Sequence, residues 1–196
     1  MTDAPTPRRV RVVGNSGSGK TTFARSLAAR LGLPHRELDE IFWEADWTHR
    51  DTAEAQGILA DFLSGPGADG WVVDGNWNGK LGGALDGADT IVWLDYPRRV
   101  VMPRVVWRTV SRGLTGQELW HGNRERLGNL LRRDPEDNIA LWAWTQHGPY
   151  RDRYAELAAA DPRVVRLWSP RAARRYLGAL SHATSAPESD TRGPRR

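Results

Sequence analysis

Short apolar runs alternate along this chain with longer segments in which apolar residues recur every three or four positions. The short runs, which we predict to be strands, are 8–13, 35–38, 71–73, 90–94 and 163–168. Most are nearly continuous in apolar residues, which is typical of strands buried on both faces of a parallel sheet. The longer segments, which we predict to be helices, are 21–32, 51–65, 99–113, 123–133, 138–160 and 169–180. This alternation predicts an α/β fold.

The helical block 99–160 interrupts the alternation, and we predict that it forms a lid over a site. One domain is expected from 8 to 180. Residues 1–7 should form a flexible N-terminus. Residues 181–196 are rich in Pro, Ser, Thr and Arg and should form a disordered tail.

Composition narrows the class of protein. Hydrophobic residues make up 39% of the 196 residues, which is enough for one core, and the absence of Cys excludes disulfides and thiolate chemistry. The sequence has no run of about 18 uncharged apolar residues, so we expect no membrane span. The first residues lack an apolar signal region, so we expect a cytoplasmic protein. The net charge of +4 permits a nucleic-acid surface but does not require one.

A glycine-rich segment lies between the first predicted strand and the first predicted helix. Its residues fit the pattern G-x-x-x-x-G-K-[ST]: Gly14, Asn15, Ser16, Gly17, Ser18, Gly19, Lys20 and Thr21, followed by Thr22. Such glycines let successive backbone N–H groups converge on phosphate oxygens at a helix N-terminus. We expect these residues to bind ATP, with Lys20 on the β- and γ-phosphates and Thr21 on Mg²⁺. The alternative is a flexible turn with an exposed lysine.

Three aspartates each follow a predicted strand. Since the carboxyl ends of parallel strands meet at one edge of a sheet, Asp39, Asp74 and Asp95 should lie on the ligand side. We assign Mg²⁺ binding, through water, to Asp74. Asp39 is the candidate general base or hydroxyl ligand for a phosphoryl acceptor. Capping and turn formation are the alternatives for both, and a turn is the favoured interpretation of Asp95.

Arg104, Arg108 and Arg112 recur every four residues and therefore share one helix face. Such a face either stabilises charge on a transferring phosphoryl group or is simply solvated. We assign catalytic roles to Lys20, Asp39, Arg104 and Arg108.

Several aromatic residues follow the candidate acidic positions. Trp43, Trp47 and Trp77 come shortly after Asp39 or Asp74, and they either wall an acceptor pocket or pack in the core. The segment 167–173, LWSPRAA, is a candidate contact for the nucleotide base.

Between 8 and 180 the chain resembles the nucleoside monophosphate kinase group of P-loop proteins. It is most similar to the adenylate-kinase-related proteins called DNA topology modulation proteins. The resemblance rests on the glycine-rich loop, on Leu38, Asp39 and Trp43, on the segment GWVVDGNW, and on the spacing of Arg104 and Arg108 after DYP. It implies a three-layer P-loop NTPase fold, with a five-stranded parallel sheet in the order 2-3-1-4-5 between helices.

The chain departs from adenylate kinases after the third strand. Asp74–Asn78 replaces their D-G-F-P-R, so the arginine that holds a monophosphate acceptor is absent. A smaller or less charged acceptor with a hydroxyl group is therefore as compatible with the sequence as a nucleoside monophosphate.

Two functions follow. The first is an ATP-dependent, Mg²⁺-requiring phosphotransferase acting on a small-molecule, nucleoside or nucleotide acceptor. The alternative is a nucleotide-regulated ATPase or binding module that could contact DNA.

Overall fold

In the computed structural model, which describes residues 6–135 and 137–183, five parallel strands form one sheet. The strands are β1 (Arg9–Gly14), β2 (His35–Glu37), β3 (Trp71–Asp74), β4 (Thr90–Leu94) and β5 (Val164–Leu167), in the order β2-β3-β1-β4-β5. The predicted fold class and strand order are confirmed.

The helices of the described residues connect and cover these strands. They are α1 (Lys20–Leu31), α2 (Leu38–Phe42), α3 (Thr52–Ser64), α4 (Arg98–Thr115), α5 (Ile139–Ala160) and α6 (Pro170–Ala183). Short 3₁₀ turns lie at η1 (Ala45–Trp47), η2 (Asn78–Lys80), η3 (Trp120–Gly122) and η4 (Leu127–Leu131). Among the described residues, no helix has the length and apolar character needed to cross a membrane.

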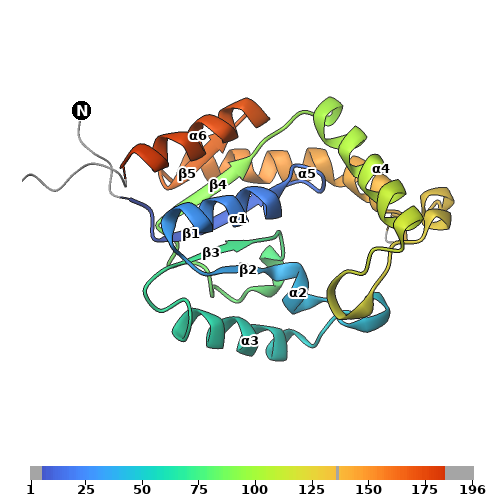
Figure 1. Cartoon of the computed structure of the whole chain (residues 1–196), viewed down its shortest axis with the longest axis horizontal. Coiled ribbons are helices and arrows are strands. Elements are labelled where there is room, and N and C mark those ends of the chain that lie inside the picture. Colours follow the sequence, from blue (N-terminus) through green and yellow to red (C-terminus); the bar gives the residue numbers. More distant parts are fainter. Residues whose placement is uncertain (1–5, 136, 184–196) are drawn as a thin grey trace, which may run out of the picture.

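The sheet lies between two helical layers (Figure 1). On one face, buried residues of β1, β3 and β4 pack against α1, the first half of α4 and α6. On the other face, Val13, Trp71 and Trp93 pack against α2, α3 and Tyr154 of α5. Both faces are therefore buried, which explains why β3 and β4 are apolar at nearly every position, whereas the short edge strand β2 is polar.

The region 99–160 contains two different kinds of structure. Helices α4 and α5 contribute Val101, Val105 and Ala143 to the core of the sheet. Between them, residues 116–135 and 137–138 form turns and the short helices η3 and η4. We call this stretch the lid segment. In Figure 1 it lies beside α2, on the side of the carboxyl ends of the strands.

Some predicted boundaries were wrong. The predicted helix 123–133 is only the 3₁₀ turn η4. The strand ends at Glu37, so Asp39 lies in the first turn of α2 instead of directly after a strand. Helix α6 extends to Ala183, three residues past the predicted end. The expectations for residues 1–5 and 184–196 lie outside the described part of the chain.

Candidate active site

The loop between β1 and α1 is shaped by its glycines. Gly17 (φ 80°) and Gly19 (φ 86°) adopt left-handed backbone conformations, which favour glycine. A Cβ atom on Gly17 would lie 2.4 Å from Cγ2 of Val105, so close packing against α4 excludes a side chain there. At Gly19, by contrast, a Cβ atom would meet no described atom within 4 Å apart from its neighbours in the chain. The first amides of α1 have no intrahelical partner and border this open corner, which is suited to an anion.

Lys20 lies at the centre of the site. Its Nζ donates to the main-chain oxygen of Asn15 over 3.3 Å. Burial lowers the pKa of Lys20, and the negative charges of Asp39 and Asp74 oppose this effect. The buried Oγ of Ser18 has no hydrogen-bond partner among the described residues. An unpartnered hydroxyl and a desolvated ammonium in one loop are the groups that a phosphate chain would satisfy.

Asp74 joins the end of β3 to α1 directly after the glycine-rich loop, residues 14–19, which we call the phosphate loop because the sequence predicts phosphate binding there. The Thr21 hydroxyl donates to Oδ2 of Asp74 over 2.9 Å, and Nε2 of His35 lies 2.7 Å from Oδ1. The side chain of Asp74 is only 4% exposed. Thr21 and Asp74 therefore adjoin, as a shared magnesium site requires. Within the described ranges no group of three or more His, Asp and Glu residues could hold a metal ion. Two oxygen ligands, from Thr21 and Asp74, would leave the other positions around a Mg²⁺ ion to waters and substrate phosphates, which is how proteins usually bind this ion.

Asp39 faces the same centre from the first turn of α2. Its Oδ1 accepts a hydrogen bond of 2.7 Å from Nε1 of Trp77. Burial raises the pKa of Asp39, while the charge of Lys20 and the Trp77 hydrogen bond act in the opposite direction. The carboxylate is thus fixed in orientation, next to a cation, in a desolvated position.

Arg108 also reaches this centre. Its Nη2 donates to Oγ of Ser16 in the phosphate loop over 3.2 Å, and its buried Nε has no hydrogen-bond partner among the described residues. Burial lowers the pKa of Arg108, and the charge of Arg112 adds to this effect, whereas Asp39 opposes it. Arg108 is therefore gathered with Lys20 and Asp39.

The rest of the predicted arginine stripe points elsewhere. Arg104 is exposed, and its guanidinium lies 5.9 Å from the centre of the Tyr96 ring. Arg112 forms an ion pair of 2.8 Å with Glu125 of the lid segment. The structure thus does not bring Arg104 into contact with the phosphate loop, and Arg112 ties α4 to the lid segment.

The tryptophans near Asp39 pack against one another. Trp77 stacks on Phe42 at 4.7 Å between ring centres, and Trp43 meets Trp77 edge-on at 5.5 Å. Trp47 in turn contacts Trp43 at 5.7 Å. Of the two interpretations of these residues, packing describes the contacts directly. Trp77 has in addition the specific contact with Asp39.

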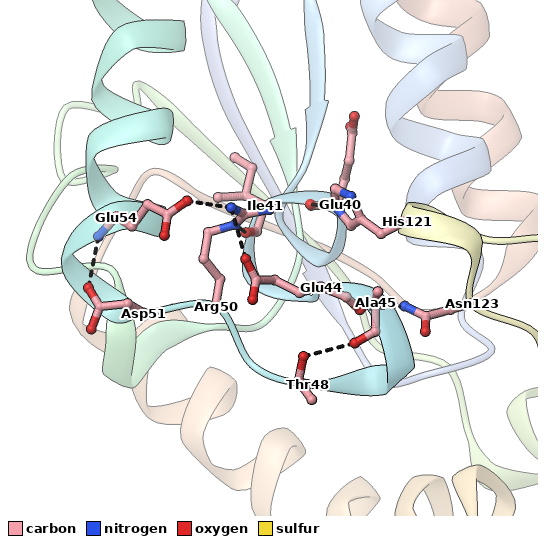
Figure 2. A network of polar contacts seen from close by, with 10 residues as sticks. All are labelled: Glu40, Ile41, Glu44, Ala45, Thr48, Arg50, Asp51, Glu54, His121 and Asn123. Atoms are coloured by element: carbon pink, nitrogen blue, oxygen red, sulfur yellow. Dashed lines mark hydrogen bonds and ion pairs between the residues drawn. The ribbon is translucent and has the colours of Figure 1, made fainter.

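The lid segment is docked on the stretch that follows α2 (Figure 2). Asn123 is 4% exposed. Its Nδ2 donates to the main-chain oxygen of Glu44 over 2.6 Å, and its Oδ1 accepts from the main-chain amide of Trp47 over 2.9 Å. Nε2 of His121 lies 2.9 Å from the main-chain oxygen of Glu40. These contacts join the lid segment to residues 40–47.

The stretch held by the lid segment is further braced by Arg50 (Figure 2). Its guanidinium pairs with Glu44 over 3.1 Å and with Glu54 over 2.5 Å, and its Nε donates to the Ile41 oxygen over 2.8 Å. Asp46 (φ 56°), Trp47 (φ 54°) and His121 (φ 57°) adopt left-handed conformations that cost non-glycine residues energy. Both sides of the docked contact are therefore tight, strained turns.

Asp95 plays a structural part, in line with its predicted place in a turn. Its buried carboxylate pairs with Arg166 over 2.6 Å and with Arg151 over 3.1 Å. These contacts join the end of β4 to β5 and α5. Asp95 makes no described contact with the phosphate loop.

Sequence reasoning missed two polar residues of the site. His35 begins β2 and reaches Asp74 because β2 pairs directly with β3. Asn76 bonds to the main chain of Gly14. The available signal was the presence of a polar residue in β2 or just after β3, the two strands on one side of β1.

Comparisons with known proteins do not assign this chain to a family. No protein-family model matches the chain, and no curated protein matches it. Among solved structures, the 1.7 Å crystal structure of shikimate kinase from Bacteroides thetaiotaomicron is similar over 92% of this chain and 100% of that chain. The sequence identity is 15% and the TM-score 0.47. The strand order and the glycine-rich loop between β1 and α1 match the predicted three-layer fold of P-loop proteins. Its resemblance to DNA topology modulation proteins stays a prediction.

Proposed function

We propose that this protein is an ATP-dependent, Mg²⁺-requiring phosphotransferase that transfers the γ-phosphoryl group to an acceptor hydroxyl or phosphate. The observation that carries the proposal is the convergence of Lys20, Asp39 and Asp74, from three separate elements, at the open corner of the phosphate loop. Each of the three has the charge that one part of the reaction needs.

The phosphate loop is the proposed nucleotide site. The amides at the start of α1 and the Lys20 ammonium would hold the β- and γ-phosphates, with the Ser18 hydroxyl as a further donor. Thr21 and Asp74 would hold Mg²⁺, which when bound neutralises charge on the phosphate oxygens. For the adenine base of the nucleotide, a shallow cavity of about 520 Å³ opens beside Ser169 and Arg171, within the segment predicted to contact that base.

Asp39 is the proposed base for a hydroxyl acceptor. Its carboxylate takes the hydroxyl proton while the acceptor oxygen forms a bond to the γ-phosphorus. The bond from that phosphorus to the β–γ bridging oxygen breaks, and ADP leaves. The Trp77 hydrogen bond leaves Oδ2 of Asp39 free to face the acceptor, because it occupies Oδ1.

Arg108 is the proposed stabiliser of the transferring group. It already bonds to the phosphate loop and has an unused donor in its buried Nε. Arg104, which is exposed beside Tyr96, is proposed to approach the nucleotide from its outer side. We expect Arg108 to contribute more than Arg104, because Arg108 is desolvated and fixed.

The alternative is a nucleotide-regulated binding module that contacts DNA. The observation that favours it is the group Arg171, Arg174 and Arg175 on α6, which lines the cavity beside Ser169. A DNA-binding function predicts an affinity that falls steeply and linearly on a logarithmic salt scale. Binding that is absent, or flat with salt, would remove this alternative.

The phosphotransferase is tested with γ-labelled ATP, Mg²⁺ and a panel of nucleotides, nucleosides and small alcohols. We expect a labelled product with at least one acceptor. We expect none with the Lys20→Ala variant, because the loop then lacks its cation. Product formation by Lys20→Ala at the wild-type rate, or no product with any acceptor, would contradict the proposal. The Lys80→Ala variant is the matched control, since Lys80 is the chain's other lysine and lies over Trp77.

A further inference from the structure

Residues 74–78, which begin with the last residue of β3, cross the whole site. Asp74 accepts the Thr21 hydroxyl on the magnesium side. Two residues later, Asn76 bonds to the phosphate loop, and the next residue, Trp77, bonds to Asp39. One short stretch of backbone thus touches the proposed metal site, the proposed nucleotide site and the proposed base.

Asn76 contacts the loop in a specific way. Its Nδ2 donates to the Gly14 oxygen over 2.7 Å, and its Oδ1 accepts from the Gly14 amide over 3.3 Å. Both main-chain groups of Gly14 are therefore held by one carboxamide. The last main-chain hydrogen bond between β1 and β3 runs from the Gly75 amide to the Val12 oxygen. The Asn76 side chain takes over the pairing where the strands diverge.

The other end of this contact is anchored in the core. The Tyr154 hydroxyl of α5 donates to Oδ1 of Asn76 over 3.2 Å and accepts from Nδ2 of Asn78 over 2.9 Å. Tyr154 is 2% exposed. Asn76 therefore has little freedom to rotate, and a displacement of Gly14 must be passed to the backbone at 76 and 77.

Trp77 carries such a displacement to the base. Its Nε1 holds Asp39, and its ring stacks on Phe42 at the end of the same short helix. Trp77 thus contacts α2 at both ends, through a hydrogen bond and through ring stacking. A change at the phosphate loop has a short path to the carboxylate, and every link in it is a described contact.

We propose that Asn76 is a positioning residue that couples the phosphate loop to Asp39, so that nucleotide binding at the loop adjusts the carboxylate that faces the acceptor. This inference rests on the proposed function, because it needs a nucleotide at the loop. Asn76 touches no reacting group and acts through Gly14 and Trp77.

The test follows the indole N–H of Trp77 by NMR. In the ¹⁵N-labelled full chain, the indole signal of Trp77 is identified by its loss in the Trp77→Phe variant. Calorimetry with MgATP establishes binding for each protein first. We expect MgATP to shift the Trp77 signal in the wild type. In Asn76→Ala the affinity for MgATP should stay within about fivefold, because phosphate contacts remain, but the shift should fall by at least half.

Asn78→Ala is the matched control. It removes an amide from the same stretch and from the same tyrosine, but it leaves both bonds to Gly14 in place. We expect it to bind MgATP and to keep the wild-type shift at Trp77. Circular dichroism reports whether each variant is folded. If Asn76→Ala is unfolded, Asn76→Asp replaces it; this variant keeps the shape of the side chain but puts a carboxylate oxygen in place of the donor to the Gly14 oxygen.

The outcomes separate the two proposals. If the wild type does not bind MgATP, the proposed function fails, and the coupling fails with it. If MgATP binds but the Trp77 signal does not move, or moves equally in the folded Asn76 variant, the coupling is overturned and the proposed function stands. Loss of the shift in Asn76→Ala with retention in Asn78→Ala supports the coupling.

Discussion

Asp39 shows how burial and contact compete at a single residue. Desolvation disfavours its charged form, whereas Lys20 and the Trp77 indole favour it. The balance is a pKa above the ordinary range of aspartate. A base must be ionised to accept a proton, so activity should rise with pH through this raised pKa. The pKa of Lys20 is lowered by burial, so loss of its charge should reduce activity at a pH below the ordinary lysine range.

The Trp77→Phe variant tests this balance. It removes a hydrogen bond that lowers the pKa of Asp39 and keeps an aromatic ring against Phe42. The pKa of Asp39 should therefore rise further, and the acidic limb of the pH–rate profile for phosphoryl transfer should move to higher pH. Trp43→Phe, which leaves the hydrogen bond to Asp39 intact, should keep the wild-type limb. An unmoved limb in Trp77→Phe would show that Asp39 is not the titrating base.

The sequence predicted some site residues better than others. Lys20 and Thr21 follow from the loop pattern, because their spacing from the glycines is fixed by the turn. Asp74 follows from its place at a strand end. His35 and Asn76 could not be predicted, because their contacts depend on which strands are neighbours and how far each extends. Arg104 and Arg108 have the same spacing pattern, yet only Arg108 meets the loop.

At the scale of elements, the strands were easier to predict than the lid segment. The inner strands β3 and β4 are short apolar runs that the sheet buries on both faces, so burial and sequence agree there. Residues 123–133 carry leucines at near-helical spacing, but Leu131 is 87% exposed and Leu127 is 38% exposed. The stretch is held instead by polar contacts of Asn123 and Glu125. Hydrophobic periodicity cannot reveal such contacts.

The docking of the lid segment depends on Asn123. Asn123→Ala removes its two side-chain hydrogen bonds, which should weaken the contact by about 1–3 kcal/mol. Hydrogen exchange at the Trp47 amide, whose acceptor is lost, should speed up by roughly five- to a hundredfold. Asn129→Ala, in the same lid segment, is the control and should leave the exchange rate unchanged. Equal exchange in Asn123→Ala and the wild type would mean that other contacts hold the lid segment.

At the scale of the whole molecule, strand order determines which loops meet. The alternation of strands and helices predicts a parallel sheet, but the order 2-3-1-4-5 came from the family resemblance and not from the pattern itself. With β1 between β3 and β4, the phosphate loop lies next to the Asp74 end of β3. The α2 segment carrying Asp39 follows the edge strand β2. Three parts of the chain more than fifteen residues apart are thereby brought to one corner.

The most direct test of the account is calorimetric titration of the full chain with MgATP, compared with the Lys20→Ala variant. We predict saturable binding by the wild type. In the variant the affinity should fall about 30-fold or more, as expected when a desolvated charge that holds an anion is removed. Absence of binding in the wild type, or equal affinity in the two proteins, would contradict the claim that this loop holds the triphosphate of a phosphotransferase.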